Sequence, residues 1–358
     1  MKSLLVNLSA LMDRPTGIST YAQNLIPFFQ KLDPTFLTAL PLRDRNAMTI
    51  PPGLSPDFGR KGHLKRLLWL QNEMPKYYRQ SNGGLIFSPL PEAPLYSDCR
   101  FVVTAHDTIP LRFSEFFPWH LVSYFRHYIR RVLAQAEHII CNSVTTARDI
   151  AHFYQIPERK ITPILLAYDR QNFRPVAVEP GNYFLYLGRQ DAHKNIPRLI
   201  SAFDRVCQQN AEVELKLVGS QDKRYRPTLV AQADSLGIGD RVHFIDYVDY
   251  HQLPRLLSGA IALTLPSLWE GFGLPVIEAM ACGTPVITSN LSSLPEVAGD
   301  AALLVDPYNI DELADAMRLV ASDTQLRQTL QSAGLQRAQH FSWQKTGEQT
   351  AQVIGRFM

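Results

Sequence analysis

Residues 266–283, which read PSLWEGFGLPVIEAMACG, decide the fold of this chain. The apolar run before them, at 260–265, predicts a buried strand. Gly271 and Gly273 allow positive φ angles and close approach of a ligand to the backbone, and Pro275 suits the first turn of a helix. A strand, a glycine loop and a helix N-terminus together form an anion site, because unpaired N–H groups and the helix dipole point at the ligand.

Two carboxylates lie eight positions apart across this junction. Glu270 falls in the loop, and Glu278 falls about one turn inside the predicted helix. An acidic side chain beside a phosphate site usually binds hydroxyl groups, such as those of a ribose or a sugar. We favour this interpretation over the alternative of two capping or solvated glutamates.

The composition is that of an ordinary globular protein with two domains. The chain has 358 residues, which is longer than a single hydrophobic core usually supports, so we expect two domains. Its content of 46% hydrophobic and 19% charged residues is typical of globular proteins. No apolar run reaches the length of a membrane span, and the start lacks a signal-peptide core, so we expect a cytoplasmic protein. The four cysteines show no metal spacing and are expected to be reduced core residues.

Strands and helices alternate along the chain, which predicts an α/β fold with two Rossmann-like domains whose parallel sheets face each other across a cleft. We place the first domain at 1–172 and the second at 173–342, with a helix at about 343–358 that packs back on the first. The clearest strand candidates are residues 4–8, 85–88, 101–105, 138–141, 183–187, 214–218 and 242–245. Ligands of such sheets bind at the carboxyl ends of the strands.

Two cations follow the first strand of the second domain. Arg189 can bind phosphate oxygens in a fork, and Lys194 supplies a compact charge. Together they would hold a diphosphate and stabilise it as it leaves. The alternative is a solvated basic loop, which the glycine loop downstream makes less attractive.

Polar groups also follow strands of the first domain. His106 comes directly after a buried strand, where it could bond a sugar hydroxyl or assist proton movement; the alternative is a structural histidine. Gly17 links the first strand to the first helix and permits close approach of a phosphate or sugar, although an ordinary turn is nearly as good an explanation.

Two further strand ends in the second domain would reach the same site. Gly219 ends the second strand and would let a ligand lie flat, while Tyr247 and Val248 end the third. The backbone of Val248 could read a base edge. These assignments rest on topology and on the family resemblance given below.

Charge is unevenly divided along the chain. Residues 1–170 carry 20 Lys and Arg against 13 Asp and Glu, whereas the rest carry 16 against 20, so the first half is expected to meet something anionic. Residues 60–71 are basic and then apolar, which suits an anionic bilayer surface as well as a core helix with a solvated start. Nucleic acid is a poorer interpretation, since no nucleic-acid module or dense basic stripe is present.

With these sites in hand, the chain resembles the retaining glycosyltransferases of family 4, which have the GT-B fold. The most specific match is Glu270 to Glu278, similar to the E-x7-E motif of that family. Gly188-Arg189 and Lys194-Asn195 resemble its diphosphate-binding loop, and the segment from His106 to Pro118 resembles a subgroup of bacterial mannosyltransferases. Many relatives have paired glycines where this chain has Thr16-Gly17.

The resemblance implies a role for each matching residue. Glu278 would bond the donor ribose, and Glu270 would hold the transferred sugar together with the backbone of Gly271, Phe272 and Gly273. Arg189 and Lys194 would bind the diphosphate, Gly17 would face it and His106 would contact the sugar. Leu274, Gly219, Tyr247 and Val248 complete the implied donor-binding set.

The implied reaction moves a hexose from a nucleotide sugar to a glycan or lipid-linked acceptor in polysaccharide biosynthesis, with retention at the anomeric carbon. GDP-mannose is the favoured donor, and neither a cofactor nor a metal is expected, since no Asp-x-Asp motif is present. A UDP-sugar glucosyl or N-acetylhexosaminyl transferase, a nucleotide-sugar 2-epimerase and a non-catalytic glycan-assembly subunit remain alternatives. Peripheral contact with the inner face of the membrane also stays open, whereas a nucleic-acid partner is not expected.

Overall fold

The computed structural model describes residues 3–12, 17–42, 45–210 and 212–358, which form two compact units. The first unit comprises the residues up to Leu166 together with Ser342–Met358, and the second comprises Ala167–Phe341. Residues 167–172, which the sequence analysis placed in the first domain, belong to the second unit. Asp169 accepts a hydrogen bond from the Tyr250 hydroxyl (3.3 Å), and Asn172 donates one to the Tyr250 carbonyl (3.0 Å), which ties this segment to the second unit.

The first unit is a seven-stranded parallel sheet in the order β3-β2-β1-β4-β5-β6-β7. Its strands are β1 (Leu4–Asn7), β2 (Pro34–Thr38), β3 (Ala47–Thr49), β4 (Leu85–Ser88), β5 (Phe101–Ala105), β6 (His138–Cys141) and β7 (Ile161–Pro163). Its longer helices are α1 (Gly17–Leu25), α2 (Gly59–Asn72), α3 (Met74–Gln80), α7 (Val144–Tyr154) and α15 (Trp343–Gly355). Its shorter ones are α4 (Ile109–Arg112), α5 (Trp119–Ser123) and α6 (Arg130–Gln135). There are also 3-10 segments, η1 (Ile26–Leu32), η2 (Pro56–Phe58), η3 (Ser114–Phe116) and η5 (Glu158–Lys160), and a π-helical segment, η4 (Tyr124–Ile129).

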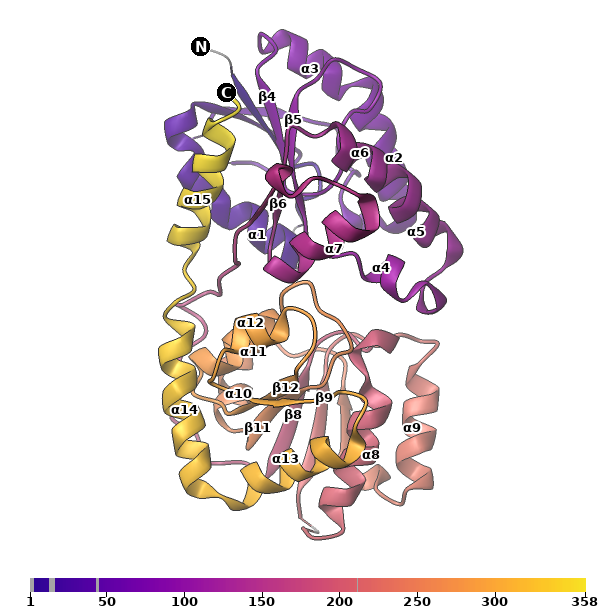
Figure 1. Cartoon of the computed structure of the whole chain (residues 1–358), viewed down its shortest axis with the longest axis vertical. Coiled ribbons are helices and arrows are strands. Elements are labelled where there is room, and N and C mark those ends of the chain that lie inside the picture. The colour runs from indigo at the N-terminus through magenta and orange to yellow at the C-terminus, as the bar shows by residue number, and fades with distance from the viewer. Residues whose placement is uncertain (1–2, 13–16, 43–44, 211) are drawn as a thin grey trace. The chain divides into compact units, whose positions relative to one another are not determined.

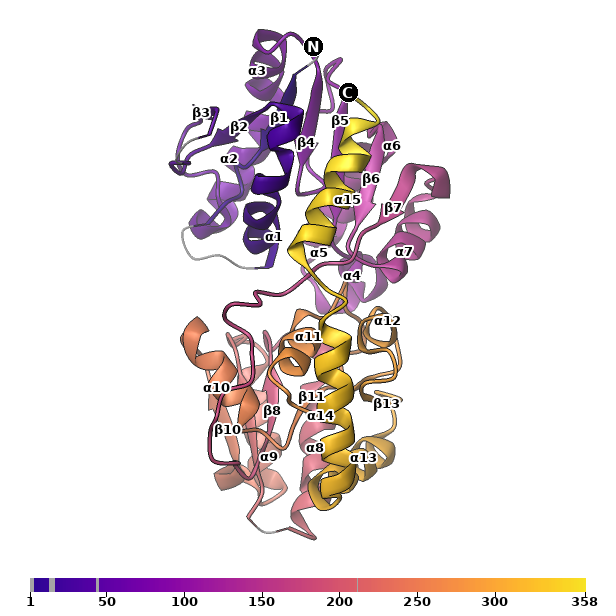
Figure 2. The ribbon, with the colours of Figure 1, turned by 90° about the vertical axis from the view of Figure 1, so that its left-hand side faces the viewer.

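Helices cover both faces of this sheet, as Figures 1 and 2 show. Alternate residues of each strand point to opposite faces. On one face, Leu5, Ile86 and Val103 pack against α2, α3, α6 and α7. The other face is covered by α1, η1 and α15. There the ring of Phe29 in η1 makes an edge contact with the ring of Phe87 in β4, with centroids 5.3 Å apart. Helix α15 is attached through Thr346, whose hydroxyl donates to the Leu165 carbonyl (2.7 Å).

The second unit is a six-stranded parallel sheet in the order β10-β9-β8-β11-β12-β13. Its strands are β8 (Tyr183–Leu187), β9 (Glu214–Val218), β10 (Val242–Ile245), β11 (Ala262–Leu265), β12 (Val286–Ser289) and β13 (Leu303–Val305). Its helices are α8 (Ile196–Cys207), α9 (Arg226–Ser235), α10 (Leu253–Ser258), α11 (Leu274–Ala281), α12 (Leu294–Ala298), α13 (Ile310–Ser322) and α14 (Thr324–Ala338), with the turns η6 (Ala192–Lys194), η7 (Gly239–Arg241) and η8 (Tyr250–Gln252). In each sheet the order reverses beside the first strand, which creates the switch point where ligands of open α/β sheets bind.

Three elements departed from the sequence predictions for identifiable reasons. The helical period of residues 119–136 predicts one helix, but the structure has a π segment there, η4. In it the Tyr124 and Tyr128 rings stack 5.3 Å apart and the Tyr124 hydroxyl donates to Glu92 (2.8 Å). The pattern of residues 64–81 predicts a second single helix, but the structure divides it at Glu73, just before Pro75 in the first turn of α3. Helix α14 was not predicted, because only Leu330, Gly334 and Ala338 along it are buried and its apolar stripe is narrow.

Two compositional predictions can be checked directly. All four cysteines are buried and free, as expected for reduced core residues. Among the described residues, none of the helices is both long and apolar enough to cross a bilayer.

Candidate active site

The β11–α11 junction forms as its sequence predicts. Strand β11 ends at Leu265 and α11 begins at Leu274, with Gly273 as its N-cap residue. Gly273 has φ +103°, a backbone angle that favours glycine, and a Cβ there would lie 2.8 Å from the Leu294 side chain, which would have to shift. The N-terminus of α11 therefore lies just beyond the carboxyl end of β11, where Pro275 has no N–H and the Val276 N–H donates to the Gly273 carbonyl (3.0 Å).

Glu270 is held in place by bonds to both of its carboxylate oxygens. The Lys194 ammonium donates to Oε1 at 2.6 Å and to Oε2 at 2.8 Å, and the Ser267 hydroxyl donates to Oε1 at 2.7 Å. The Glu270 N–H donates to Ser292 Oγ (3.1 Å), and Ser293 Oγ lies 3.0 Å from the Glu270 carbonyl. The loop is thus fixed before any ligand arrives.

The environment of Glu270 keeps it ionised. Burial acts to raise the pKa of this carboxyl, but Lys194, His193 and the bond from Ser267 outweigh it and hold the pKa below its usual value. The side chains of Lys194 and Glu270 are only 16% and 10% exposed, so they form a nearly buried ion pair. An ammonium has three N–H donors, and a phosphate oxygen can take one that Glu270 does not use.

Glu278 sits in a different electrostatic setting. It is the fifth residue of α11, and burial together with the nearby Asp169 raises the pKa of its carboxyl to about 7. Tyr250 belongs to the same cluster, since its hydroxyl bonds Asp169 and the charge of Glu278 helps to raise the Tyr250 pKa. Glu278 therefore changes charge near neutral pH, unlike Glu270.

Arg189 lies at the surface beside the end of β8. Its side chain is 75% exposed, and its Nε lies 3.2 Å from a carboxylate oxygen of Asp191. The Tyr186 hydroxyl donates to the Arg189 carbonyl (2.6 Å), which fixes the backbone while the guanidinium reaches into solvent. The two predicted cations are thus dissimilar: Lys194 is enclosed and paired, whereas Arg189 is open to a ligand.

The fold requires glycine at position 219, which the sequence alone did not reveal. Its φ is +136°, and a Cβ would lie 2.0 Å from the Gly188 carbonyl oxygen. The loops that follow β8 and β9 can approach this closely only with glycine at 219. Gln190 ties them further, since its N–H donates to the Ser220 carbonyl at 3.1 Å.

The remaining predicted donor residues fall into two groups. Tyr247 is 69% exposed and its hydroxyl donates to Asp249 (3.1 Å), while Val248 beside it and Leu274 at the start of α11 are partly exposed. The Phe272 side chain, by contrast, is buried against Phe341 with ring centroids 6.0 Å apart. Phe272 can therefore offer a ligand its backbone but not its ring, and the adjoining Gly271 is partly exposed.

Asn195 belongs to the predicted diphosphate-binding loop, but the sequence assigned it no role of its own. It adopts a left-handed conformation with φ +62°, and its Nδ2 donates to the carbonyls of Pro266 (3.0 Å) and Pro307 (2.7 Å). The Leu268 N–H also donates to the carbonyl of the buried His193 (2.8 Å). These bonds clamp the Lys194 loop to the Glu270 loop; an asparagine directly before an apolar helix was the signal for such a turn.

In the first unit, His106 follows β5 as predicted. Its Nε2 lies 2.8 Å from the Pro89 carbonyl oxygen, and a carbonyl only accepts, so Nε2 carries the proton. Burial lowers the His106 pKa, so the ring is neutral at pH 7 with Nδ1 as an acceptor. Gly17 is exposed at the start of α1, and the neighbouring Thr16 lies outside the described residues.

The described residues contain no cluster of metal-binding side chains. Within residues 3–12, 17–42, 45–210 and 212–358, no three His, Cys, Asp or Glu side chains gather as they would around a metal ion.

Comparison with solved structures shows the fold class. The chain aligns over 99% of its length with a sucrose-phosphate synthase from Thermosynechococcus elongatus (TM-score 0.81, 21% identity, 99% of that chain covered). It aligns over 98% with WaaG, a glycosyltransferase involved in lipopolysaccharide biosynthesis (TM-score 0.75, 16% identity, 99% covered). The predicted two-domain α/β fold of the GT-B class is confirmed.

Sequence comparison gives the family. Residues 15–171 match the model described as Glycosyltransferase Family 4, and residues 168–337 match Glycosyl transferases group 1. The chain is 30% identical to O-antigen chain mannosyltransferase B of Escherichia coli over 263 residues, covering 70% of this chain and 69% of that protein. It is 32% identical to O-antigen chain mannosyltransferase RfbU of Salmonella typhimurium, covering 62% and 68%. The chain therefore belongs to the family 4 glycosyltransferases, and it is an enzyme of the hexosyltransferase type.

Proposed function

We propose that this enzyme transfers mannose from GDP-mannose, with retention at the anomeric carbon, to a glycan or lipid-linked acceptor in polysaccharide biosynthesis. The observation that carries the proposal is the Lys194–Glu270 pair beside the N-terminus of α11. It brings a fixed ammonium, the positive end of the α11 helix dipole and a carboxylate to one strand end, as a sugar diphosphate requires. Similarity to the two O-antigen mannosyltransferases supports mannose as the transferred sugar.

Leaving-group stabilisation is the proposed source of catalysis. As the bond from the anomeric carbon to the phosphate oxygen breaks, its electron pair passes to the diphosphate, and Lys194 and Arg189 offset the growing charge. Lys194 is suited to this role because Glu270 already orients it at 2.6 and 2.8 Å, so little reorganisation is needed. We infer that transfer needs no metal, and unchanged activity in the presence of EDTA is the expected result.

Retention without a covalent intermediate is supported by the state of Glu270. Both of its oxygens accept hydrogen bonds from Lys194 and one also accepts from Ser267, so its charge is already engaged and it is a poor nucleophile. The acceptor hydroxyl would then attack the face that the diphosphate leaves, and its proton would pass to a diphosphate oxygen. The neutral His106 of the first unit would accept a hydrogen bond from the transferred sugar through Nδ1, as the family resemblance implies.

Recognition of the donor nucleotide falls to α11 and the loops around it. Glu278 would accept hydrogen bonds from the ribose hydroxyls, Gly17 would face the diphosphate, and the backbone of Val248 would meet the base. A thermal-shift screen tests this directly, because a ligand that binds the native state raises the melting temperature. We expect GDP and GDP-mannose to raise it more than UDP and UDP-glucose.

A UDP-sugar transferase is the second candidate. A structural neighbour, HepE of Anabaena, has been solved in complex with UDP and glucose (TM-score 0.77, 18% identity, 99% of this chain and 100% of that chain covered). A larger shift with UDP than with GDP would favour this candidate. Incubating the donor without acceptor separates the other two alternatives: a 2-epimerase yields a new sugar nucleotide, and a non-catalytic subunit gives no turnover with any acceptor.

We further propose peripheral contact with an anionic bilayer through the outer face of α2. Leu64 and Leu68 are 59% and 55% exposed one turn apart, and Lys61 and Lys65 share their face. The inner face is anchored by Arg66, whose guanidinium bonds the buried Glu92 at 2.6 and 2.9 Å. Exposed leucines flanked by lysines match an interfacial helix.

Vesicle sedimentation tests the membrane contact. The protein should pellet with phosphatidylglycerol vesicles more than with phosphatidylcholine vesicles, and L64S/L68S should reduce this. Equal pelleting of the parent and the variant would show that α2 does not mediate membrane contact.

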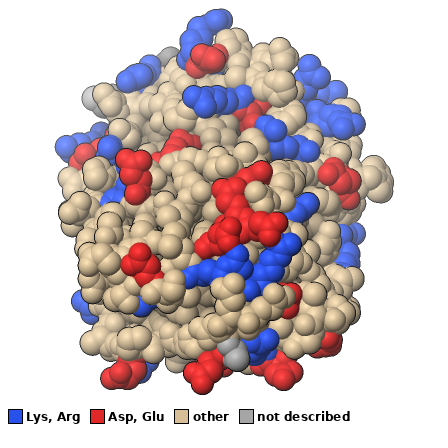
Figure 3. Space-filling model, turned by 60° about the horizontal axis from the view of Figure 1, so that its bottom comes forward, with Lys and Arg blue, Asp and Glu red and all other residues tan. Residues whose placement is uncertain are grey.

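The face of the molecule in Figure 3 carries charges of both signs. Acidic side chains gather at its centre and basic ones lie beside them, rather than in the single-sign stripe typical of nucleic-acid binding.

A further inference from the structure

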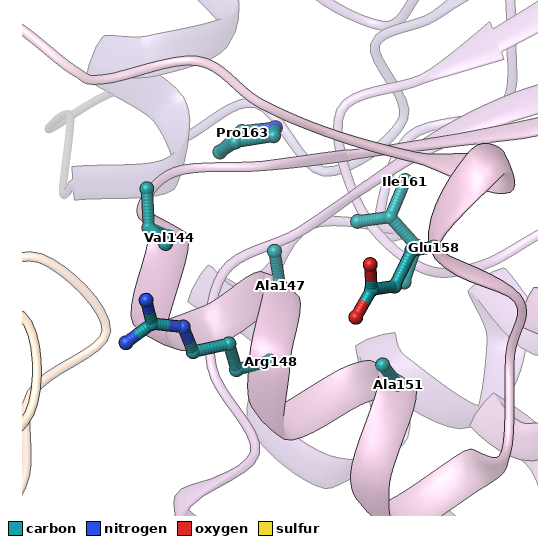
Figure 4. Close-up of a pocket in the computed structure, with 7 residues that line it drawn as sticks. All are labelled: Val144, Ala147, Arg148, Ala151, Glu158, Ile161 and Pro163. Atoms are coloured by element: carbon teal, nitrogen blue, oxygen red, sulfur yellow. The ribbon is translucent and has the colours of Figure 1, made fainter.

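A hollow of about 300 Å³ lies in the first unit between α7 and the segment formed by η5 and β7. Its aliphatic lining consists of Val144, Ala147, Ala151, Ile161 and Pro163. Two charged residues complete it, and Figure 4 shows the Arg148 guanidinium near Val144 and the Glu158 carboxylate turned toward the two alanines. The volume is at the lower end of the range for small-molecule sites.

Within the part of the chain that the structure describes, no hydrogen bond engages the Arg148 or Glu158 side chain. Arg148 and Glu158 are exposed, and among the described residues neither side chain has an ion-pair partner. A guanidinium offers up to five donors and a carboxylate only acceptors. The hollow thus combines an apolar floor with a donor and an acceptor that are both available to a ligand.

The place of the hollow in the fold links it to the predicted site of the first unit. Val144 begins α7 shortly after β6, and Pro163 ends β7, so one end of the hollow lies at the carboxyl edge of the sheet, while Glu158 and Ile161 line it at the amino end of β7. The same helix braces the His106 loop, since the Thr146 hydroxyl donates to the His106 carbonyl (3.4 Å) and Asp149 accepts from the Thr108 hydroxyl (3.0 Å). Ligands of open α/β sheets bind at this edge.

We propose that this hollow is a subsite for one neutral pyranose ring of the acceptor glycan. Arg148 donates to ring hydroxyls, Glu158 accepts from them, and the C–H face of the sugar rests on the aliphatic floor. The two charges cancel, which favours a neutral ligand with both donors and acceptors: a phosphate would be repelled by Glu158, and a wholly apolar group would use neither charge. This assignment rests on the proposed glycosyl transfer, since it supplies the acceptor side of that reaction.

A binding measurement that needs no turnover tests the subsite. The protein carries isotope-labelled alanine and isoleucine methyl groups, and NMR spectra are recorded with methyl α-mannoside, mannobiose, glycylglycine and inorganic phosphate. We expect the saccharides to shift the Ala147, Ala151 and Ile161 signals, and Ala151→Trp to abolish the shift, while Ala134→Trp on α6 does not. Absence of saccharide shifts here, or shifts with glycylglycine or phosphate alone, would overturn the assignment.

Kinetics provide the second readout. Arg148→Ala and Glu158→Ala each remove one charged hydrogen-bonding group and should raise the acceptor KM about tenfold, with the donor KM unchanged. Arg159→Ala, an exposed change on η5 outside the hollow, is the matched control and should alter neither constant. An unchanged acceptor KM in both variants contradicts the subsite. If the parent enzyme transfers no sugar at all, the proposed function fails, and the NMR result still decides whether the hollow binds a saccharide.

Discussion

Removal of the Lys194 ammonium should affect stability as well as turnover. Its Nζ lies 2.6 and 2.8 Å from the oxygens of Glu270, whose side chain is 10% exposed. Lys194→Ala would leave a nearly buried carboxylate with only the Ser267 hydroxyl as a strong partner. Breaking a buried pair costs about 3–5 kcal/mol, and residual exposure places this one near 3 kcal/mol. For a unit of this size the melting temperature should fall by about 6–12 °C.

The double variant Lys194→Ala/Glu270→Gln separates stability from catalysis. It removes both charges, so calorimetry should show most of the lost stability restored while transfer activity stays absent. Lys76→Ala is the matched control: its pair with Glu73 is about half exposed, and its loss should cost less than 1 kcal/mol. A single variant as stable as the parent, or a double variant no more stable than the single, would refute the inference of a buried coupled pair.

The pH dependence follows from the lowered Glu270 pKa. A carboxyl whose pKa is lower in the folded state contributes stability above its unfolded pKa, and this contribution is lost as the pH falls through the folded value. The stability gap between the parent and Lys194→Ala should therefore be full at pH 7 and shrink below about pH 4.5. A gap that widens toward acid pH would contradict the assignment.

Four further predictions concern Gly219, Arg189 and Glu278. Gly219→Ala should destabilise the protein by about 2–4 kcal/mol in urea unfolding, because its Cβ would lie 2.0 Å from the Gly188 carbonyl oxygen. The control Gly237→Ala, at φ +71° with open space around it, should cost about 1 kcal/mol. Equal losses of stability in the two variants would contradict the steric argument. Arg189→Ala should leave the melting temperature unchanged, since the side chain is 75% exposed, but should remove most transfer activity; near-normal turnover would exclude the diphosphate role. Between pH 4.5 and about 7 the folded protein binds more protons at Glu278 than the unfolded chain, so stability should fall as pH rises, and Glu278→Gln should flatten this slope. Glu278→Ala should also raise the donor KM, and a change in the acceptor KM alone would exclude the ribose role.

Local sequence patterns determined most of the strands and the helix that begins at the donor loop. Buried parallel strands are continuous apolar runs, so the strands at 85–88, 101–105 and 138–141 were predicted with the bounds that the structure shows. The glycines and the proline at 271–275 likewise marked where β11 gives way to α11. The short strands β2 and β3 were not predicted. Strand β2 directly follows the 3-10 helix η1, and β3 has only three residues and is partly exposed, so neither has an apolar run distinct from the loops around it.

Side-chain partners depended on contacts between distant segments. From the sequence, Glu270 was expected to be free for a sugar and Lys194 for a phosphate, yet they bond each other across 76 positions of the chain. Likewise, Gly219 looked like a ligand-facing glycine until its closeness to Gly188 appeared.

By itself, the sequence determined that the chain builds two parallel sheets with an anion-binding turn and two carboxylates at one strand end, because periodicity and turn chemistry act over a few residues. The tertiary structure decided that one carboxylate is paired and ionised while the other titrates near pH 7 beside Asp169. Charge state depends on burial and on which distant group lies within a few ångströms, and only the folded chain brings those groups together.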